Sequence, residues 1–551
     1  MAPAFLVCAL VLAQAVAPGM PQRPGGSAPS DPAGTAVIRG TVTAADTGRP
    51  LRRARVTLTG QPLSAARATS TNIRGEYELK DLPAGRYVLR VQRGGYLPMQ
   101  YGQRRPGEAA QPLDLADGQA LGKLDMALPR AGIISGRVVD ETGEAVSGVR
   151  VWPMRQEYFR GRRRLVPAGS DGTTDDTGQY RILNVPPGEY YLMALLRETW
   201  TAGPERQTFG YAPTYFPGMA RVADASRVKV GIAQEAANID FALVAQRASV
   251  VSGIATGADG TPLAGARVSL SLEIMGPGVG MSMSAGGATV AADGSWRMRG
   301  VAPGEYQLAV SSQERDRPPA RASMTLFVQG ADIEGLSLVA DTGGTVTGQI
   351  VTDTGEALPT PPVRMRVVAE PIGPDQRPYG IMVGDENGVA TTDGRFTLTG
   401  ALGRSVLRLQ GLPRGWVVKS IDAGDRDLAE SPLEVRGGET VDARIVITNR
   451  FPIVSGRVVD EKANPSAGSV LLFPTDAAMW FDPGVLRLTR PDQTGLFRFE
   501  NVRPGDYLAV ALEVLESWQA SDPEFLEGLR SSATSVTVRE GQPLQLSLTV
   551  R

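Results

Sequence analysis

Histidine is absent from this chain of 551 residues, and cysteine occurs once, as Cys8 near the N-terminus. A chain without histidine has no histidine-dependent catalytic triad and no zinc site of the His/Cys type. If the N-terminal apolar stretch is removed, the cysteine goes with it, which also excludes a cysteine nucleophile and disulfide bonds. We therefore predict no catalytic residues, no metal and no cofactor, and only metal sites made of carboxylates stay open as an alternative.

Net charge and long apolar runs are also scarce. The chain has 57 Lys and Arg against 58 Asp and Glu, for a formal net charge of -1. This balance gives no drive towards nucleic acid or an anionic membrane. Beyond the N-terminal stretch, no apolar run is long enough to cross a bilayer as a helix. We predict no nucleic-acid partner and no transmembrane segment in the mature chain.

The N-terminus has the pattern of a secretory signal. Phe5 to Val16 is apolar and has the length of a signal-peptide h-region, and A-x-A cleavage patterns close it. We predict a signal peptide at residues 1–17, with a disordered apolar N-terminus as the alternative. Residues 18–36 are rich in Pro, Gly, Ser and Ala and are predicted to be a flexible linker. The expected location is secreted, periplasmic or cell-surface.

Glycine and proline are abundant, at 65 and 41 residues, and the glycines recur in register. The opening glycines, each in a strand-like phrase, are Gly40, Gly136, Gly253, Gly348 and Gly456. The middle-turn glycines, each in an Asp-marked turn, are Gly75, Gly178, Gly294, Gly394 and Gly495. The closing glycines, ten residues further on, are Gly85, Gly188, Gly304 and Gly505. The fourth copy has Gly403 there instead, one residue short. A repeat of this length, dense in turn signals, predicts a string of small β domains.

The apolar residues alternate within these phrases, as in half-buried strands. Val268, Leu270 and Leu272 share one face, and Tyr306 and Leu308 share another. With one last strand after each closing strand, every copy has about seven short strands. The predicted fold class is all-β, a tandem array of about five antiparallel β-sandwich domains of prealbumin/Ig-like type. The five domains, called repeats 1 to 5 below, are predicted at residues 37–130, 131–247, 248–341, 342–450 (divergent) and 451–551.

The repeated phrases carry a family resemblance. In the second copy they read ISGRVVDETGE, TDDTGQYRI and VPPGEYYLMA, from Ile134 to Ala194. The pattern G-x-V-x-D-x-x-G, then D-x-x-G-x-[YF], then P-G-x-Y resembles the carboxypeptidase regulatory-like domain, over nearly all of residues 37–551. Copy one departs from it at Ala84-Gly85 and copy four at Leu402-Gly403. The resemblance implies a transthyretin-like, carbohydrate-binding-like β-sandwich and an accessory role in binding carbohydrate or protein.

Two recurring residue types are predicted to be structural. An Asp near each turn, such as Asp140 or Asp175, is expected to bond backbone N–H groups while the nearby Gly takes a positive φ. Calcium ligation is the alternative, and only Asp171, Asp175 and Asp176 come near the required convergence of carboxylates. The closing Tyr residues are expected to pack in the core with the hydroxyl bonded to backbone. They are Tyr87, Tyr190, Tyr306 and Tyr507.

The second copy is unusually aromatic, and its stretch TFGYAPTYFPGM lies outside the regular strands. Exposed aromatic rings in loops are typical of contact sites, and sugar-binding sites use their flat faces. The candidate ligand-binding residues are Trp200, Tyr211, Tyr215, Phe216, Trp152 and Tyr158. A packed loop is the alternative, because copy one has a fainter echo of the same pattern.

Two insertions have their own signals. An arginine run from Arg160 to Arg164 is predicted to be a solvated hairpin tip, with polyanion binding as the alternative. A short helix is predicted after Asp522, which suits the N-cap, with Pro523 in its first turn and its end near Arg530.

These features favour a non-catalytic, secreted or periplasmic, multi-domain binding protein of the carboxypeptidase regulatory-like type that binds carbohydrate. The alternative is a structural scaffold or adhesin-like protein–protein interaction rod at a bacterial cell surface. A third reading, a glycoside hydrolase that uses two carboxylates, needs a facing pair that nothing in the sequence picks out. The expected partner is a glycan or a cell-surface protein.

Overall fold

The computed structural model describes residues 34–159, 162–276, 279–312, 319–359, 365–371, 387–413, 415–428, 432–480, 485–492, 494–516 and 518–551. The predicted signal peptide, and the predicted linker before residue 34, lie outside the described residues. The described chain is built almost wholly of β-strands, arranged as pairs of sheets that enclose hydrophobic cores. The predicted all-β sandwich class is confirmed.

The first sheet of each repeat is centred on the opening strand. This strand pairs antiparallel with the strand after the middle turn, and parallel with the last strand of the repeat. The opening strands are β1 (Ala36–Ala44), β10 (Gly132–Val139), β23 (Ser249–Gly257), β30 (Gly344–Thr352) and β38 (Val454–Val459). Their antiparallel partners are β4 (Glu76–Leu82), β14 (Gln179–Val185), β26 (Ser295–Val301), β32 (Arg395–Ala401) and β41 (Leu496–Phe499). Their parallel partners are β8 (Ala120–Leu121) with β9 (Met126–Leu128), β20 (Glu235–Ala236) with β21 (Phe241–Ala242), β29 (Ile333–Ala340), β37 (Thr440–Thr448) and β44 (Leu544–Thr549).

The second sheet of each repeat is antiparallel and contains the closing strand. In repeats 1, 2, 3 and 5 its two central strands are β2 (Arg55–Gln61) and β5 (Gly85–Gln92), β11 (Arg150–Phe159) and β15 (Gly188–Leu195), β24 (Arg267–Gly276) and β27 (Gly304–Ser311), and β39 (Ser469–Pro474) and β42 (Gly505–Leu512). In repeat 4 the central strand of the described sheet is β33 (Gly403–Gln410), with β31 (Arg366–Pro371) at its edge. The flanking strands are β3 (Arg67–Ser70), β6 (Met99–Gln100), β7 (Leu113–Leu115), β12 (Arg162–Pro167), β13 (Gly172–Thr173), β18 (Thr214–Tyr215), β19 (Val228–Val230), β25 (Val279–Thr289), β28 (Arg321–Val328), β36 (Leu433–Val435), β40 (Arg487–Thr489) and β43 (Thr534–Val538).

The remaining elements are additions to the two sheets that the repeats share. In repeat 4, β34 (Val417–Ala423) and β35 (Arg426–Asp427) extend the first sheet. In repeat 2, β16 (Thr199–Ala202) and β17 (Gln207–Tyr211) form a projecting hairpin that pairs with β22 (Ala245–Arg247). The helices are η1 (Val222–Asp224), η2 (Ala477–Met479), η3 (Gln519–Ser521), α1 (Pro523–Leu529) and η4 (Arg530–Ser532). The predicted helix is confirmed as α1, and the Asp522 side chain accepts a hydrogen bond from the N–H of Glu524 at its start.

The opening glycines lie where the last strand crosses closest to the central strand. A Cβ at Gly40 would overlap the backbone carbonyl of Leu124, and a Cβ at Gly136 would overlap that of Ile239. In repeat 1 the same Leu124 carbonyl accepts a hydrogen bond from the Tyr77 hydroxyl at 2.6 Å. Only a residue without a side chain permits this approach.

Hydrophobic clusters fill the space between the paired sheets. Alternation along the strands places Val56, Leu58 and Leu89 of repeat 1 in one such cluster. A second kind of packing occurs between repeats 2 and 3. There Trp152 and Met193, from the second sheet of repeat 2, join the core cluster of repeat 3. Neighbouring repeats are therefore packed together rather than joined only by the chain.

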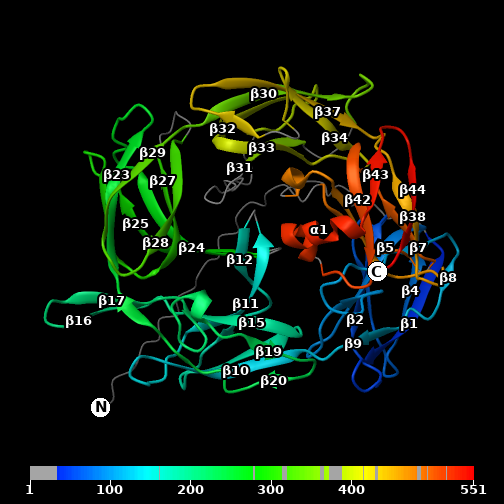
Figure 1. Ribbon diagram of the computed structural model, residues 1–551, viewed down its shortest axis with the longest axis horizontal. Helices are drawn as coiled ribbons and strands as arrows, with labels where there is room; N and C mark the ends of the chain where they lie inside the picture. The colour runs from blue at the N-terminus through cyan, green and yellow to red at the C-terminus, as the bar shows by residue number, and fades with distance from the viewer. Residues whose placement is uncertain are drawn as a thin grey trace, which may run out of the picture.

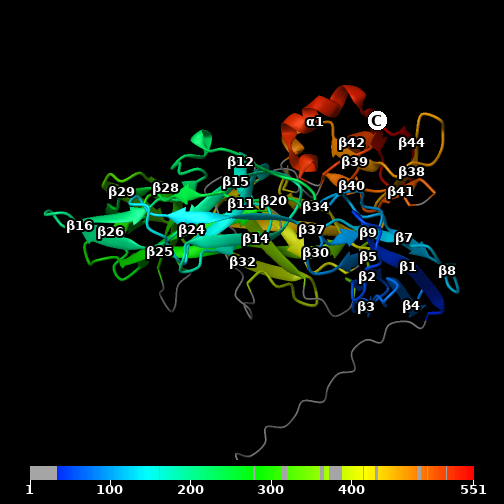
Figure 2. The same cartoon turned by 90° about the horizontal axis from the view of Figure 1, so that it is seen from below.

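The five repeats form a closed ring, with α1 near its centre (Figure 1). Seen from the side, repeats 1 to 4 lie at about one level, and repeat 5, with α1, is raised above repeat 1 (Figure 2). Repeat 5 meets repeat 1 through Arg490 and Glu108, whose side chains are 3.1 Å apart, and it meets repeat 2 through Glu524 and Arg163, 2.7 Å apart. The predicted rod is therefore wrong: insertions in repeats 1, 2 and 5 carry the charged groups that bring the two ends of the array together.

The close approach at Gly40 yields a test. We expect Gly40→Ala to lower the free energy of unfolding by about 1–3 kcal/mol, because the new methyl group forces β1 away from the last strand. Thermal unfolding followed by circular dichroism measures this change. Gly122→Ala is the matched control in the same repeat, since a Cβ there meets nothing within 4 Å. Equal unfolding temperatures for the two variants would contradict the role given to Gly40.

Candidate functional site

The recurring Asp residues serve their turns. The Asp175 carboxylate accepts hydrogen bonds from the backbone N–H groups of Thr177 and Gln179, both at 2.9 Å, and from the Thr177 hydroxyl at 2.7 Å. These bonds, led by that of the Thr177 side chain, lower the pKa of Asp175. The middle-turn glycines that follow all have positive φ, including Gly178 at 75°. The predicted turn role is confirmed. In the part of the chain that the structure describes, no three acidic side chains gather as a metal site would require.

The closing Tyr residues also have the predicted structural role. Tyr87 and Tyr190 are buried, and each hydroxyl donates a hydrogen bond to the carbonyl four residues earlier, at 2.7 Å to Pro83 and 2.5 Å to Pro186. The Tyr306 hydroxyl does the same. The bond fixes the turn before each closing strand to the core beneath it.

The aromatic candidates of repeat 2 do not form one exposed face. Trp152 is 3% exposed, between the Arg150 guanidinium, 4.5 Å from its ring, and the core of repeat 3. Tyr215 is partly buried against the same core. Phe216 packs edge-on against Phe241 in the core of repeat 2, with ring centroids 5.8 Å apart.

The other candidates lie elsewhere. Trp200 and Tyr211 contact each other with centroids 4.8 Å apart, and Trp200 stacks on Phe209 at 6.1 Å. Tyr211 is 9% exposed, while Trp200 is half-buried. Tyr158 lies apart on β11, half-buried. The structure thus joins Trp200 with Tyr211, and it places Trp152 and Tyr215 against the core of repeat 3. Ligand binding by these six residues stays a prediction.

Three cavities lie where repeats meet. One, about 800 Å³, is between repeats 1 and 2, and Arg53, Arg55 and Arg93 contribute to its lining. A second, about 230 Å³, lies between repeats 4 and 5 and contains Leu407 and Arg487. A third, about 70 Å³, lies between repeats 2 and 3. Contact between repeats therefore creates the concave surfaces on which a ligand can be held.

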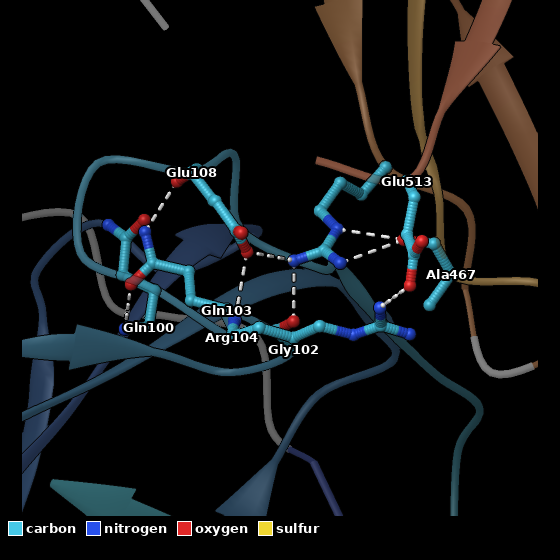
Figure 3. A network of polar contacts seen from close by, with 8 residues as sticks. Gln100, Gly102, Gln103, Arg104, Glu108, Ala467 and Glu513 are labelled. Atoms are coloured by element: carbon cyan, nitrogen blue, oxygen red, sulfur yellow. Dashed lines mark hydrogen bonds and ion pairs between the residues drawn. The ribbon is translucent and has the colours of Figure 1, made fainter. Parts of the chain in front are cut away.

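The junction of repeats 1 and 5 is a buried polar network (Figure 3). The Arg490 guanidinium, from just after β40, is 1% exposed and faces the Glu108 carboxylate of repeat 1 at 3.1 Å. It also donates hydrogen bonds to the carbonyls of Gly102 in repeat 1 and Ala467 in repeat 5. The Glu108 carboxylate accepts a further bond from the N–H of Arg104 at 2.9 Å. Burial lowers the pKa of Arg490, and the facing Glu108 carboxylate opposes that shift.

This network was not found from the sequence, because no local pattern links residues 382 positions apart. One arginine of the cavity between repeats 1 and 2 could have been found from the sequence. Arg53 stands in the turn where repeats 2 and 3 have Gly148 and Gly265. An alignment of the repeats on this turn, rather than on the opening glycines alone, would have found it.

Comparison with known proteins supports the fold. The family model of the carboxypeptidase regulatory-like domain matches residues 37–128 and 133–243. The predicted resemblance is confirmed there, and these two segments are carboxypeptidase regulatory-like domains. No curated protein matches the chain at a significant level. No helix among the described residues has the length and apolar character needed to span a bilayer.

Several solved structures are similar in fold. The Bacillus anthracis TIE protein is 11% identical, with 76% of this chain and 74% of that chain covered and a TM-score of 0.16. The Streptococcal ancillary pilin is 14% identical, with 56% and 99% covered and a TM-score of 0.20. The major pilin subunit of Bacillus cereus is 12% identical, with 76% and 99% covered and a TM-score of 0.16.

Two tyrosines at the junction of repeats 2 and 3 allow a test of this packing. Burial raises the pKa of Tyr215 and of Tyr306 to about 12, and the Glu305 carboxylate adds to the shift at Tyr215. Because the folded state holds the neutral phenol, these groups stabilise the fold fully below pH 10, and the stabilisation is lost as the pH rises from 10 towards 12. In a spectrophotometric titration, we expect a step of phenolate absorbance near pH 12. The step should shrink in the Tyr215→Phe/Tyr306→Phe variant. A folded protein whose phenolates all form near pH 10 would rule out the burial described here.

Proposed function

We propose that the chain is a secreted, non-catalytic binding scaffold at a cell surface, in which a closed ring of β-sandwich repeats holds the clefts between repeats in fixed shape. The observation that carries this proposal is the Arg490–Glu108 ion pair, buried at the closure of the ring. Two charges leave water at a high free-energy cost unless each is paired and hydrogen-bonded. The Arg490 guanidinium is hydrogen-bonded by groups of both repeats, which supports one fixed geometry for the ring, while Oε1 of Glu108 is buried without a hydrogen-bond partner among the described residues.

Further contacts support the same view. The helical insertion of repeat 5 reaches repeat 2, where Arg163 lies 2.7 Å from Glu524 at the start of α1. The arginine run, predicted as a solvated tip, contributes in this way to a contact between repeats. On the other side of repeat 5, Lys419 of repeat 4 pairs with Glu540. Repeat 5 therefore contacts repeats 1, 2 and 4.

The non-catalytic part of the proposal is supported by the residues of the clefts. A glycoside hydrolase needs two carboxyl groups that face each other across the substrate. The lining of the cleft between repeats 1 and 2 contains no Asp or Glu. The chain also lacks histidine, so the common hydrolytic mechanisms that use it do not apply.

Secretion and the type of partner are the finer parts of the proposal. The apolar segment from Phe5 to Val16 supports export from the cytoplasm. Of the two sequence-based readings, the scaffold now has the stronger support, with a ring in place of the rod. Carbohydrate binding stays a proposal, supported more by the cleft between repeats 1 and 2 than by the largely buried aromatic residues of repeat 2.

Opening the ring tests the proposal. We expect Arg490→Met to lower the free energy of unfolding by about 3–5 kcal/mol, because it leaves the Glu108 carboxylate buried without its partner. The ring should open, and small-angle X-ray scattering should report a larger radius of gyration. The double variant Arg490→Met/Glu108→Leu removes both charges and should recover much of the lost stability.

The exposed pair between the same two repeats is the matched control. Arg104 and Glu513 lie 2.9 Å apart, and both side chains are more than half exposed. Arg104→Ala should change the free energy of unfolding by less than about 1 kcal/mol and leave the scattering unchanged. If Arg490→Met scatters and unfolds as the unaltered protein does, the ring is not held closed by this pair and the proposal fails.

A further inference from the structure

The cleft between repeats 1 and 2 has an unbalanced charge. It has a volume of about 800 Å³ and receives Arg53, Arg55 and Arg93 from repeat 1. Repeat 2 contributes the neutral side chains of Ser170 and Asn184. No acidic residue lines it, and no carboxylate among the described residues pairs with Arg53 or Arg55. Three guanidinium groups gathered in one concave surface raise the local concentration of anions.

Arg53 occupies a position that repeats 2 and 3 give to glycine. Its N–H donates to the carbonyl of Thr71 at 2.9 Å, and the N–H of Gly148 in repeat 2 donates to the carbonyl of Thr174 at 3.0 Å. The surroundings match as well, since the hydroxyls of Thr71 and Thr174 each accept from the next N–H and donate to a carbonyl of the same turn. Repeat 3 places Gly265 at the same point, bonded to Val290.

The backbone at this position is left-handed. Gly148 and Gly265 have φ of 75° and 79°, and Arg53 has φ of 57°. Glycine adopts this region freely, whereas a residue with a Cβ is sterically disfavoured there. Repeat 1 therefore has an arginine in a strained conformation at a position where repeats 2 and 3 form the same turn with glycine. Strain of this kind gathers where a side chain has a use that the fold does not require.

The cleft presents guanidinium groups rather than an aromatic platform. Tyr96 lines it, but its ring is already in contact with two cations, since Arg93 and Arg130 lie 5.5 and 5.6 Å from the ring centroid. Arg130 is also bound to Asp46 at 2.7 Å. The ring of Tyr96 thus holds Arg93 in place.

The donors of the cleft far outnumber its charged acceptors. Each arginine offers five N–H donors and no acceptor, and the side chains of Gln92, Ser170 and Asn184 add neutral donors. A peptide brings a backbone N–H with almost every carbonyl and suits this lining poorly. A chain of sugars with carboxylate groups brings carboxylate oxygens, which only accept hydrogen bonds, and hydroxyl groups, which both accept and donate them. We propose that the cleft between repeats 1 and 2 binds an acidic polysaccharide, with Arg53 and Arg55 on its carboxylates. This inference rests on the proposed function, since it names the ligand of one cleft in the ring.

The first test uses the mature protein and polygalacturonate as the probe, with dextran as the neutral polysaccharide. We expect calorimetric titration to show binding of polygalacturonate that weakens as salt is added, and no binding of dextran. Arg53→Gly should lower the affinity about tenfold, and Arg53→Gly/Arg55→Ala about a hundredfold. The unfolding temperature of Arg53→Gly should stay the same or rise, because glycine relieves the strain at this position.

Arg52→Ala is the matched control, since Arg52 is exposed beside Arg53 and does not line the cleft. It should bind polygalacturonate as the unaltered protein does. The proposal is overturned if the unaltered protein does not bind polygalacturonate, if Arg53→Gly binds it unchanged, or if polyglutamate binds as tightly, which would make charge alone the determinant.

The same experiment separates this inference from the scaffold proposal. A ring that opens in Arg490→Met, in a protein without affinity for polygalacturonate, leaves the scaffold in place and removes the cleft as a binding site. If binding depends on the arginines but the Arg490→Met variant keeps its shape and stability, the cleft is a binding site and the scaffold proposal fails.

Discussion

In every repeat the opening glycine lies against the backbone of the last strand, and the sandwich is arranged around this contact. A side chain there would overlap the carbonyl of Leu124, Ile239, Leu336, Ala443 or Leu546, taking the repeats in order. The last strand is thereby able to run parallel to the opening strand. This is clearest in β30 and β38, where the parallel pairing is continuous. Without this approach the first sheet would lose its parallel partner, and one side of the core would lie open to water. The strict recurrence of glycine at these positions is thus a packing requirement.

Local physical rules made much of this fold predictable from the sequence. Turns marked by Asp and Gly, buried closing tyrosines and a helix begun by Asp522 and Pro523 all depend on residues within a few positions of one another. The direction of the last strand was not predictable in that way, since the alternation of apolar residues is the same in parallel and antiparallel pairs. The buried Trp152 has a similar explanation. It follows Val151, so the two side chains point to opposite faces of the sheet, and the sequence of repeat 2 alone does not show that repeat 3 covers the outer face.

The shape of the whole molecule depends on contacts between residues that are far apart in the sequence. Glu108 and Arg490 are 382 positions apart, and each is an ordinary surface residue by composition. The change from an expected rod to a ring follows from loops that lie outside the strands, which are the parts of a repeat least constrained by its fold. Packing between repeats 2 and 3 fixes one angle of the array, and the buried pair fixes another, so that small rotations at each junction add up to closure rather than to an open superhelix.

The comparison of Arg53 with the equivalent residues of repeats 2 and 3 indicates that it has a binding role. Three repeats share the same turn, with the same hydrogen bonds, and two of them place glycine at its left-handed position. Repeat 1 has arginine in place of glycine. Arginine does not stabilise the turn, because the backbone conformation there is one that glycine adopts more easily. A residue that breaks a local rule without a structural benefit is expected where binding or catalysis is the constraint. The Arg53 side chain lines the cleft that repeats 1 and 2 form together. A ring that holds those repeats in place spares a ligand the free-energy cost of ordering them.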